Sequence, residues 1–375
     1  MFGCRNPIKE RVMTNEDDRR NELISELDGY VRLGEPDKTE KAYAWRIAIG
    51  LQQTDGLTPS PYLIETAKQN IEGSITFDKV KERLDNYYRT RPAEAAAGVR
   101  TEEADKVSAR IAEILSERTF TFSVTGYTLI HKRLFSGIYG FAGDIRDYDI
   151  TKFEWVLDGG TVLYARADDI RTLLWQEFEQ EKEFSYRGLT KKQTAEHIAR
   201  FVSAIWKIHA FGEGNTRTTA VFAIKYLHSL GFEVTNDMFA GHSWYFRNAL
   251  VRANYSDLNN GIHSTNEYLD RFFGNLMLGE KNILKNREMH VLAHATVCQA
   301  APAAVPGRAD APNGLTATEL RVFNAIADGR FITADEIAEA VGVTGRTVKK
   351  ITSALIERGL IKRIGSRRSG KWVRL

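Results

Sequence analysis

Apolar residues recur three and four positions apart over most of the chain, which is the spacing of amphipathic helices. Before residue 95 this spacing predicts helices over 38–53, 65–72 and 80–88. Farther along it predicts helices over 101–117, 125–139, 167–181, 190–208, 217–230 and 243–254. Gly231 follows the helix 217–230 as a C-terminal cap. We therefore expect a mainly α fold.

One short segment departs from the helical spacing. Residues 154–164, EWVLDGGTVLY, hold two short apolar runs of β type on either side of Asp158-Gly159-Gly160. A turn of this kind between two such runs is typical of a hairpin. The sequence therefore predicts a β-hairpin set among helices.

Two changes in composition divide the chain. Residues 295–314 contain three of the eight prolines and many alanines without periodicity, as in a semi-extended linker. A weaker boundary follows Arg91-Pro92, where residues 93–99 are rich in alanine. We expect an N-terminal helical region over 1–95, a core domain over 96–294, a linker over 295–314 and a small domain over 315–375.

Overall composition narrows the class of protein. Among 375 residues 43% are hydrophobic and 27% charged, which excludes disorder as the main state. Apolar runs are far shorter than the ~18 residues of a membrane span, and residues 1–20 lack an apolar signal core. Cys4 and Cys298 are too few for a disulfide framework. We therefore expect a cytoplasmic protein without membrane contact.

The loop between the helices 190–208 and 217–230 is the segment richest in chemical groups. It reads HAFGEGNTRTT over 209–219 and ends at a helix N-terminus, where free N–H groups attract phosphate. His209 is the candidate base, since neutral imidazole accepts protons near pH 7. Glu213 suits a divalent ion, and Arg217 suits phosphate oxygens. Two glycines and Asn215 complete the set, with Gly212 and Gly214 admitting close backbone approach.

Each of these residues alone has a plainer interpretation. A single His at a helix end more often caps or packs, and Gly-rich loops are commonly only turns. The combination of base, carboxylate, glycines, Asn and Arg within nine residues favours a site.

The segment HAFGEGNTR resembles the signature of the Fic family, His-Pro-Phe-x-Asp/Glu-Gly-Asn-Gly-Arg-x-x-Arg. The surrounding segments, IHKRLFSGIYGFAGDIRDYDI, the hairpin and the stretch ending at Asn254, are also similar to Fic cores. The resemblance covers about residues 125–287 and implies a Fic-type helical bundle with a hairpin flap. The matching motif positions are His209, Phe211, Glu213, Gly214, Asn215 and Arg217.

The resemblance implies a protein adenylyltransferase. His209 would deprotonate a Ser, Thr or Tyr hydroxyl of a target protein, whose oxygen attacks the α-phosphate of ATP, and Glu213 would hold Mg²⁺. The hairpin would bind the target segment by strand addition through Trp155, Val156 and Leu157. The nucleotide would contact Gly212, Glu213, Gly214, Asn215, Thr216 and Arg217, with adenine near Tyr245, Phe246 and Asn254. Helix packing is an equal alternative for Tyr245 and Phe246.

Three motif positions depart from the family pattern: Ala210 replaces Pro, Thr216 replaces Gly and Ala220 replaces the second Arg. One phosphate clamp is thus missing. Some relatives that lack this Arg are kinases, so transfer of the γ-phosphate stays open. A third alternative is a transcriptional regulator whose core only senses a nucleotide.

Residues 48–88 resemble the small antitoxins that obstruct Fic sites. Their pattern, Ser/Thr-x-x-x-Glu-Gly, falls on Leu51 and Asp55-Gly56, so the motif is degraded. We expect this inhibitory segment to pack on the core but to restrain ATP weakly. The alternative is that Asp55 pairs with another cation, such as Arg217.

The basic charge gathers in the C-terminal part. From residue 315 onward there are 12 Lys and Arg against 6 Asp and Glu, whereas the rest has 40 against 43. This part resembles a winged helix-turn-helix, with helices at 333–341 and 346–358 and a wing over 360–375. Val348, Ile351, Leu355 and Ile356 should face inward. We expect DNA to contact Arg346, Lys349, Lys350, Arg367 and Arg368. Protein contact is the alternative, and a homodimer stays open.

Overall fold

The computed structural model describes residues 15–90, 95–234 and 238–295, and in the C-terminal part 319, 322–323, 326, 337, 345–358, 361–364 and 371–374. The chain divides into two compact units, residues 1–300 and 301–375. Each unit is described by itself. No helix among the described residues has the length and apolarity of a membrane span.

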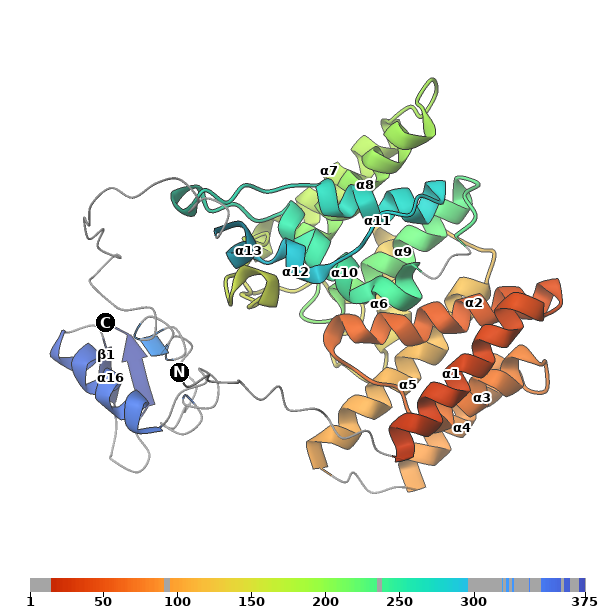
Figure 1. Ribbon diagram of the computed structural model, residues 1–375, viewed down its shortest axis with the longest axis horizontal. Coiled ribbons are helices and arrows are strands. Elements are labelled where there is room, and N and C mark those ends of the chain that lie inside the picture. The colour runs from red at the N-terminus through yellow and green to blue at the C-terminus, as the bar shows by residue number, and fades with distance from the viewer. Residues whose placement is uncertain are drawn as a thin grey trace, which may run out of the picture. The chain divides into compact units, whose positions relative to one another are not determined.

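The first unit is helical (Figure 1), and the mainly α fold class is confirmed. Its N-terminal helices are α1 (Asn15–Leu33), α2 (Pro36–Leu51), α3 (Pro61–Ile71), α4 (Phe77–Thr90) and α5 (Ala95–Ser116). Its later helices are α6 (Val124–Phe135), α7 (Ile170–Glu183), α8 (Lys191–Ile208), α9 (Asn215–Ser229), α10 (Met238–Ala253), α11 (Glu267–Leu278), α12 (Asn286–Met289) and α13 (Val291–Ala295). Short 3₁₀ turns are η1 (Gln52–Asp55), η2 (Trp155–Leu157), η3 (Ala167–Asp169) and η4 (Leu258–Asn260).

Local sequence signals set several helix ends. Ser60 and Ser123 cap α3 and α6 by accepting a backbone N–H of the first turn. Thr190 forms a capping box with Gln193 at the start of α8. Gly231 follows α9 with φ 82° and donates to the His228 carbonyl, which confirms the predicted cap.

The N-terminal helices share a core with the rest of this unit. The helix α2 packs against α1 and α3 and also against α5 and α10, as Figure 1 shows. Its buried side chains include Trp45, Ile47 and Leu51. This packing places η1, which follows α2 directly, beside α9 and α10.

The strands expected over 154–164 do not form. Residues 155–157 wind into η2, and Asp158 and Gly159 follow with φ 53° and 82°. The Glu154 N–H donates to the Gly160 carbonyl at 2.9 Å, so the predicted turn is present without a ladder. The β-hairpin flap is thus corrected to a loop closed around a 3₁₀ turn.

The second unit contains a helix and a two-stranded sheet. These are α16 (Gly345–Glu357), β1 (Ile361–Ile364) and β2 (Lys371–Arg374), with β1 antiparallel to β2 and Ile361 opposite Arg374. Val348, Ile351 and Leu355 are buried as expected, whereas Ile356 is 44% exposed, so its inward placement was wrong. The helix expected over 333–341 lies outside the described residues except for Ile337.

Candidate active site

The chain turns sharply at His209, directly after α8. His209 has φ 53°, in the left-handed region that non-glycine residues seldom adopt. Arg146 stabilises this turn, since its Nε donates to the His209 carbonyl at 2.8 Å and its backbone N–H donates to the Ala210 carbonyl. The buried side chain and the backbone N–H of Arg146 thereby satisfy two carbonyls just after the end of α8.

The His209 side chain is 4% exposed and lies against the Tyr164 ring, with centroids 4.1 Å apart. Its Nδ1 is buried and makes no hydrogen bond among the described residues. Burial, together with the charges of Lys152 and Arg247, lowers the pKa of His209 well below its usual value. The ring is therefore neutral near pH 7 and keeps a nitrogen free to accept a proton.

The loop after His209 is fixed by its own side chains. Asn215 accepts from the Phe211 N–H at 3.0 Å and donates to the Phe211 carbonyl at 2.7 Å, so its amide holds the turn. The Thr216 hydroxyl accepts from Trp206 Nε1. Both residues are buried. The polar groups of Asn215 and Thr216 therefore hold the loop in this state.

The two loop glycines are covered by aromatic side chains. A Cβ at Gly212 would lie 2.5 Å from the Tyr148 hydroxyl, and one at Gly214 would lie 2.4 Å from the Phe135 ring. Gly214 also has φ 76°. Close packing on Phe135 and a left-handed backbone thus require glycine at Gly214, whereas at Gly212 a Cβ would meet the end of the half-exposed Tyr148 side chain. The sequence had assigned both glycines to the approach of an anion.

Arg217 is fully enclosed, with 1% of its side chain exposed. Its Nε lies 2.7 Å from Asp55 Oδ2, an ion pair in which the N–H is not well directed at the oxygen. Its other nitrogens donate to Gln52 Oε1 at 3.1 Å and Glu103 Oε1 at 2.7 Å. Burial opposes the charge, but these carboxylates raise the pKa of Arg217 above its usual value.

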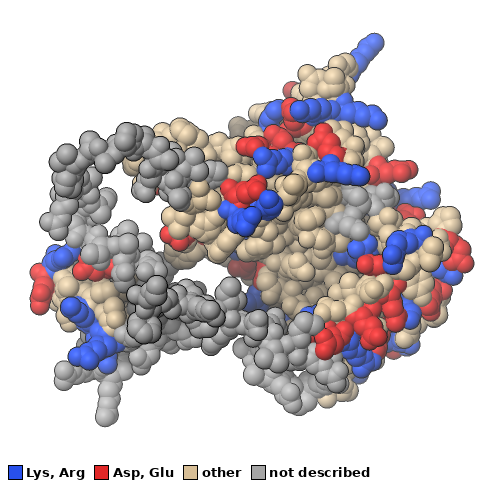
Figure 2. Space-filling model, viewed as in Figure 1, with Lys and Arg blue, Asp and Glu red and all other residues tan. Residues whose placement is uncertain are grey.

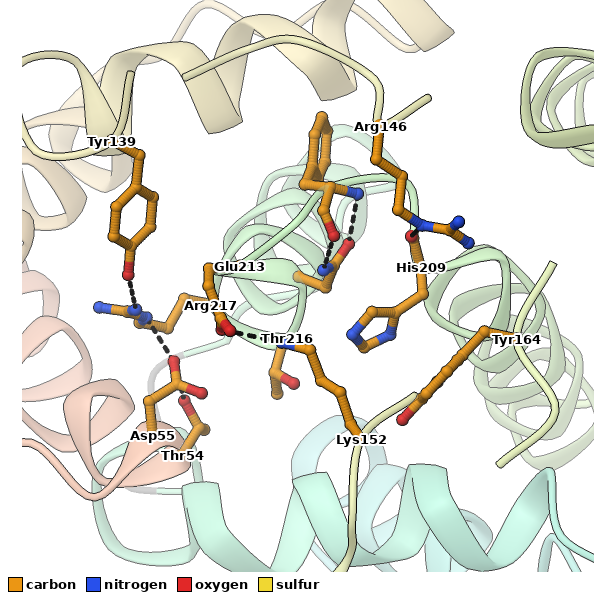
Figure 3. A network of polar contacts seen from close by, with 12 residues as sticks. Thr54, Asp55, Tyr139, Arg146, Lys152, Tyr164, His209, Glu213, Thr216 and Arg217 are labelled. Carbon is orange, nitrogen blue, oxygen red and sulfur yellow. Dashed lines mark hydrogen bonds and ion pairs between the residues drawn. The ribbon is translucent and has the colours of Figure 1, made fainter. Parts of the chain in front are cut away.

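A second arginine reaches the same carboxylate. Arg247 Nη1 donates to Asp55 Oδ1 at 3.0 Å and to the Thr54 carbonyl at 2.9 Å. Its Nη2 donates to both oxygens of Glu154, which is buried at the start of the loop 154–160. Asp55 thus pairs with both arginines. The pair with Arg217, which the sequence analysis gave as the alternative to weak restraint, is drawn in Figure 3.

Comparison with known families agrees with this geometry. Residues 121–227 match the model of the Fic/DOC family. The chain carries a Fic/DOC domain. Residues 313–372 match the model of the sugar-specific transcriptional regulator TrmB, so the C-terminal region is of the TrmB winged-helix type. No curated protein matches the chain significantly.

Solved Fic structures from Bartonella are similar to about half of the chain. The N-terminal FIC domain of Bep8 from Bartonella sp. 1-1C has 17% identity and a TM-score of 0.40, over 51% of this chain and 88% of its own. BepC from Bartonella tribocorum, with bound AMPPNP, has 20% identity and a TM-score of 0.36, over 53% and 86%. A Fic domain with bound ADP from Bartonella quintana has 20% identity and a TM-score of 0.40, over 51% and 94%.

Within the Fic domain, Glu213 is the carboxylate suited to a metal. Its side chain is 54% exposed, and its Oε2 lies 2.8 Å from Lys152 Nζ (Figure 3). No cluster of three metal-binding side chains occurs among the described residues. A single accessible carboxylate still fits Mg²⁺, which is commonly bound by one or two carboxylates together with substrate phosphates.

The three residues expected near adenine lie apart. Tyr245 and Phe246 are buried among core aromatic rings such as Phe272, so packing accounts for both. Asn254 instead lines a cavity of about 490 Å³ and donates to the Ser203 hydroxyl. Asn254 thus borders an open space, whereas Tyr245 and Phe246 are buried.

The loop 154–160 offers only part of the expected target surface. Val156 and Leu157 are buried, whereas Trp155 is 48% exposed and lies against His290, with ring centroids 4.9 Å apart. The two buried side chains pack into the core instead of facing a target. Trp155 is the exposed residue of this set.

The residues expected at DNA lie on α16 where they are described. Arg346, Lys349 and Lys350 are exposed. Figure 2 shows basic side chains on the described part of the second unit. Arg367 and Arg368 lie outside the described residues.

Sequence reasoning missed several residues that build the site. His131 holds the loop: its Nδ1 accepts from the Gly143 N–H, its Nε2 donates to the Glu213 carbonyl, and its ring stacks on Phe211 at 3.7 Å. Burial lowers the pKa of His131 to about 4, so it is neutral. Only its place in the segment IHKRLF, already noted as similar to Fic cores, pointed to it. The other missed residues are Gln52, Glu103, Arg146, Lys152, Glu154 and Arg247.

Proposed function

We propose that the chain transfers AMP from ATP to a hydroxyl group of a target protein. The observation that carries this proposal is the neutral imidazole of His209, at the start of a Fic loop that leads into the N-terminus of α9. Its Nδ1 has no hydrogen-bond partner within the part of the chain that the structure describes. A base and a helix N-terminus side by side suit attack of a hydroxyl on a bound phosphate.

The proposed step balances as follows. The hydroxyl oxygen of the target bonds to the α-phosphorus, the bond from that phosphorus to the bridging oxygen of pyrophosphate breaks, and the hydroxyl proton passes to His209. Pyrophosphate takes the bonding electrons. Mg²⁺ held by Glu213 would neutralise phosphate charge. Arg217 and the N–H groups of the loop would orient the phosphates, so rate enhancement comes from positioning and electrostatics.

The proposed inhibitory segment has to withdraw before this step. Asp55 and Gln52 occupy one side of Arg217, and His209 is almost fully covered. A triphosphate and a target hydroxyl need these groups exposed. The N-terminal segment with Asp55 and Gly56 therefore acts as a restraint, stronger than the degraded motif suggested.

We further propose that the C-terminal unit binds DNA through α16 and the wing. Its TrmB-type region and the exposed Arg346, Lys349 and Lys350 support this. The chain would thus join a transferase to a DNA-binding module.

Labelled ATP tests the transferase. With ATP labelled at the α-phosphate, we expect label on protein in an Asp55→Ala background and none after His209→Ala is added, while ATP still binds. The control is His263→Ala, an exposed histidine outside the loop. Label from the γ-phosphate would show a kinase, and ATP binding without any transfer would leave only a nucleotide sensor.

A further inference from the structure

Two arginines from different helices converge on one carboxylate. Arg217 of α9 contacts Asp55 Oδ2, and Arg247 of α10 contacts Asp55 Oδ1. The side chains of Arg217, Arg247 and Asp55 are 1%, 17% and 17% exposed, so water screens the group little. A carboxylate thus lies between two guanidinium groups in the interior of the first unit.

Each guanidinium has one fixed side and one replaceable side. Arg217 is held by Glu103 on α5 through Nη2, while Nε and Nη1 face Asp55 and Gln52. The replaceable contacts all come from η1. If η1 moves away, Glu103 still fixes the direction of Arg217 and two nitrogens become free.

Arg247 is arranged in the same way. Its Nε and Nη2 bind the buried carboxylate of Glu154, while Nη1 donates to Thr54 and Asp55 of η1. Withdrawal of η1 would free Nη1 and leave the guanidinium held by Glu154. Both guanidinium groups would then point at the position that the Asp55 carboxylate had occupied.

The Fic motif of this chain lacks its second phosphate-binding arginine, because that position is the buried Ala220. We propose that Arg247 supplies the missing cation and binds a phosphate of the nucleotide together with Arg217 once η1 withdraws. This inference rests on the proposed function, and it assigns a phosphate-binding role to a residue of α10 outside the motif.

The local electrostatics favour an anion at this place. Burial alone would raise the pKa of Asp55, yet Arg217, Arg247 and Lys152 lower it below its usual value. Arg247 and Lys152 also lower the pKa of His209. The anion position and the base therefore lie within reach of the same cations, as a phosphate chain and its base require.

A purely structural ion pair is the competing explanation, and binding measurements separate the two. The probes are ATP, AMP and inorganic tripolyphosphate, titrated against the full chain by calorimetry. Asp55→Ala serves as the background, because it removes the carboxylate that lies between Arg217 and Arg247. Two single changes, Arg247→Gln and Arg247→Lys, are added to this background. A third variant combines Arg247→Gln with Glu154→Gln, so that no buried carboxylate is left without a partner. Arg171→Gln, an exposed arginine of α7, is the matched control.

We expect Asp55→Ala to tighten ATP and tripolyphosphate binding. Loss of Arg247 should then weaken both by about 10- to 100-fold, the usual effect of a hydrogen bond to a charged group. Arg247→Lys should restore part of the affinity, and AMP binding should change little. Thermal unfolding of each variant shows whether the fold is kept.

Equal ATP and tripolyphosphate affinities with and without Arg247, in folded variants, would overturn the proposal while leaving the transferase intact. An equal loss of affinity for ATP, tripolyphosphate and AMP on removal of Arg247 would also overturn the proposal, because it would show that Arg247 only supports the structure. Binding of tripolyphosphate that depends on Arg247, without ATP binding or transfer in any variant, would support the anion site and refute the proposed function.

Discussion

At the residue scale, the backbone conformation of His209 and its buried ring belong to one arrangement. A left-handed residue costs about 1–2 kcal/mol, and here Arg146 offsets it by binding the carbonyls around the turn. The turn directs the imidazole toward the side on which Lys152 and Thr216 lie (Figure 3). The strained residue is thus also the one with the chemical role that we propose.

Lys152 should control the pH range of transfer. A base must be neutral to accept a proton, so activity falls as the pH drops through the pKa of His209. That pKa is lowered by burial first and then by Lys152. Lys152→Met should therefore raise it and move the acid limb of kcat/KM to higher pH. Transfer rates measured from pH 4.5 to 8 check this.

The control for this profile is Lys191→Met, an exposed lysine in the first turn of α8. It should leave the acid limb in place. An unchanged limb in Lys152→Met, or a limb moved to lower pH, would show that His209 does not titrate as the base of the reaction.

At the element scale, a buried carboxylate joins three N-terminal helices. Asp105 of α5 accepts from the Ser60 N–H at 2.8 Å, from the Ser60 hydroxyl and from the Tyr88 hydroxyl of α4 at 2.6 Å. Ser60 is also the cap of α3. Burial raises the pKa of Asp105 to about 6, despite these hydrogen bonds.

This raised pKa predicts a pH dependence of stability. The folded chain binds the proton more tightly than the unfolded chain, whose pKa is about 3.9. The stability from Asp105 is thus full below pH ~4 and falls by about 2–3 kcal/mol as the pH rises through 6. The wild type should exceed Asp105→Asn in free energy of unfolding by a larger amount at pH 4.5 than at pH 7. Urea titrations followed by tryptophan fluorescence measure both free energies.

Asp85→Asn on α4 is the matched control, since this carboxylate is largely exposed and pairs with Lys106. Its difference from wild type should stay nearly constant between the two pH values. If the difference for Asp105→Asn is flat or grows toward pH 7, the carboxylate is already charged in the folded chain at pH 4.5.

Local pattern accounts for most helices and for the motif loop. The predicted helices agree with α2 to α10 apart from a few residues at their ends, and α11 carries the same spacing at Tyr268, Leu269 and Phe272. By contrast, α1 has few apolar positions, so its pattern is weak. The prediction of strands over 154–164 was wrong because the backbone forms the 3₁₀ turn η2, which buries Val156 and Leu157 in the core.

Contacts between distant segments lie beyond such patterns. Asp55 and Arg247 are 192 positions apart, and Gln52 and Arg217 are 165 apart. A single sequence shows the charges but not which of many partners each one meets. The degraded inhibitory motif pointed to weak restraint because Ala220 cannot pair with Asp55. The structure supplies two other arginines, and the packing of η1 against α9 and α10 brings them to Asp55.

At the scale of the whole molecule, the chain joins a first unit that contains a Fic/DOC domain to a second unit of the TrmB winged-helix type. The net charge of +3 comes wholly from the second, because the residues before 315 carry an acidic excess. Binding of DNA by the full chain should therefore depend on the exposed basic residues of α16 and on salt.

Each phosphate contact contributes a slope of about 0.9 in a plot of log affinity against log salt concentration. Lys349→Ala with Lys350→Ala should therefore reduce the slope by about two units and weaken binding in low salt. Anisotropy of a labelled random-sequence duplex, titrated with the full chain at several NaCl concentrations, measures both. Lys281→Ala, an exposed lysine of the first unit, should leave the slope unchanged. Retention of the full slope without the two lysines would place the DNA contact elsewhere, and no binding even in low salt would make the winged helix a protein-binding module.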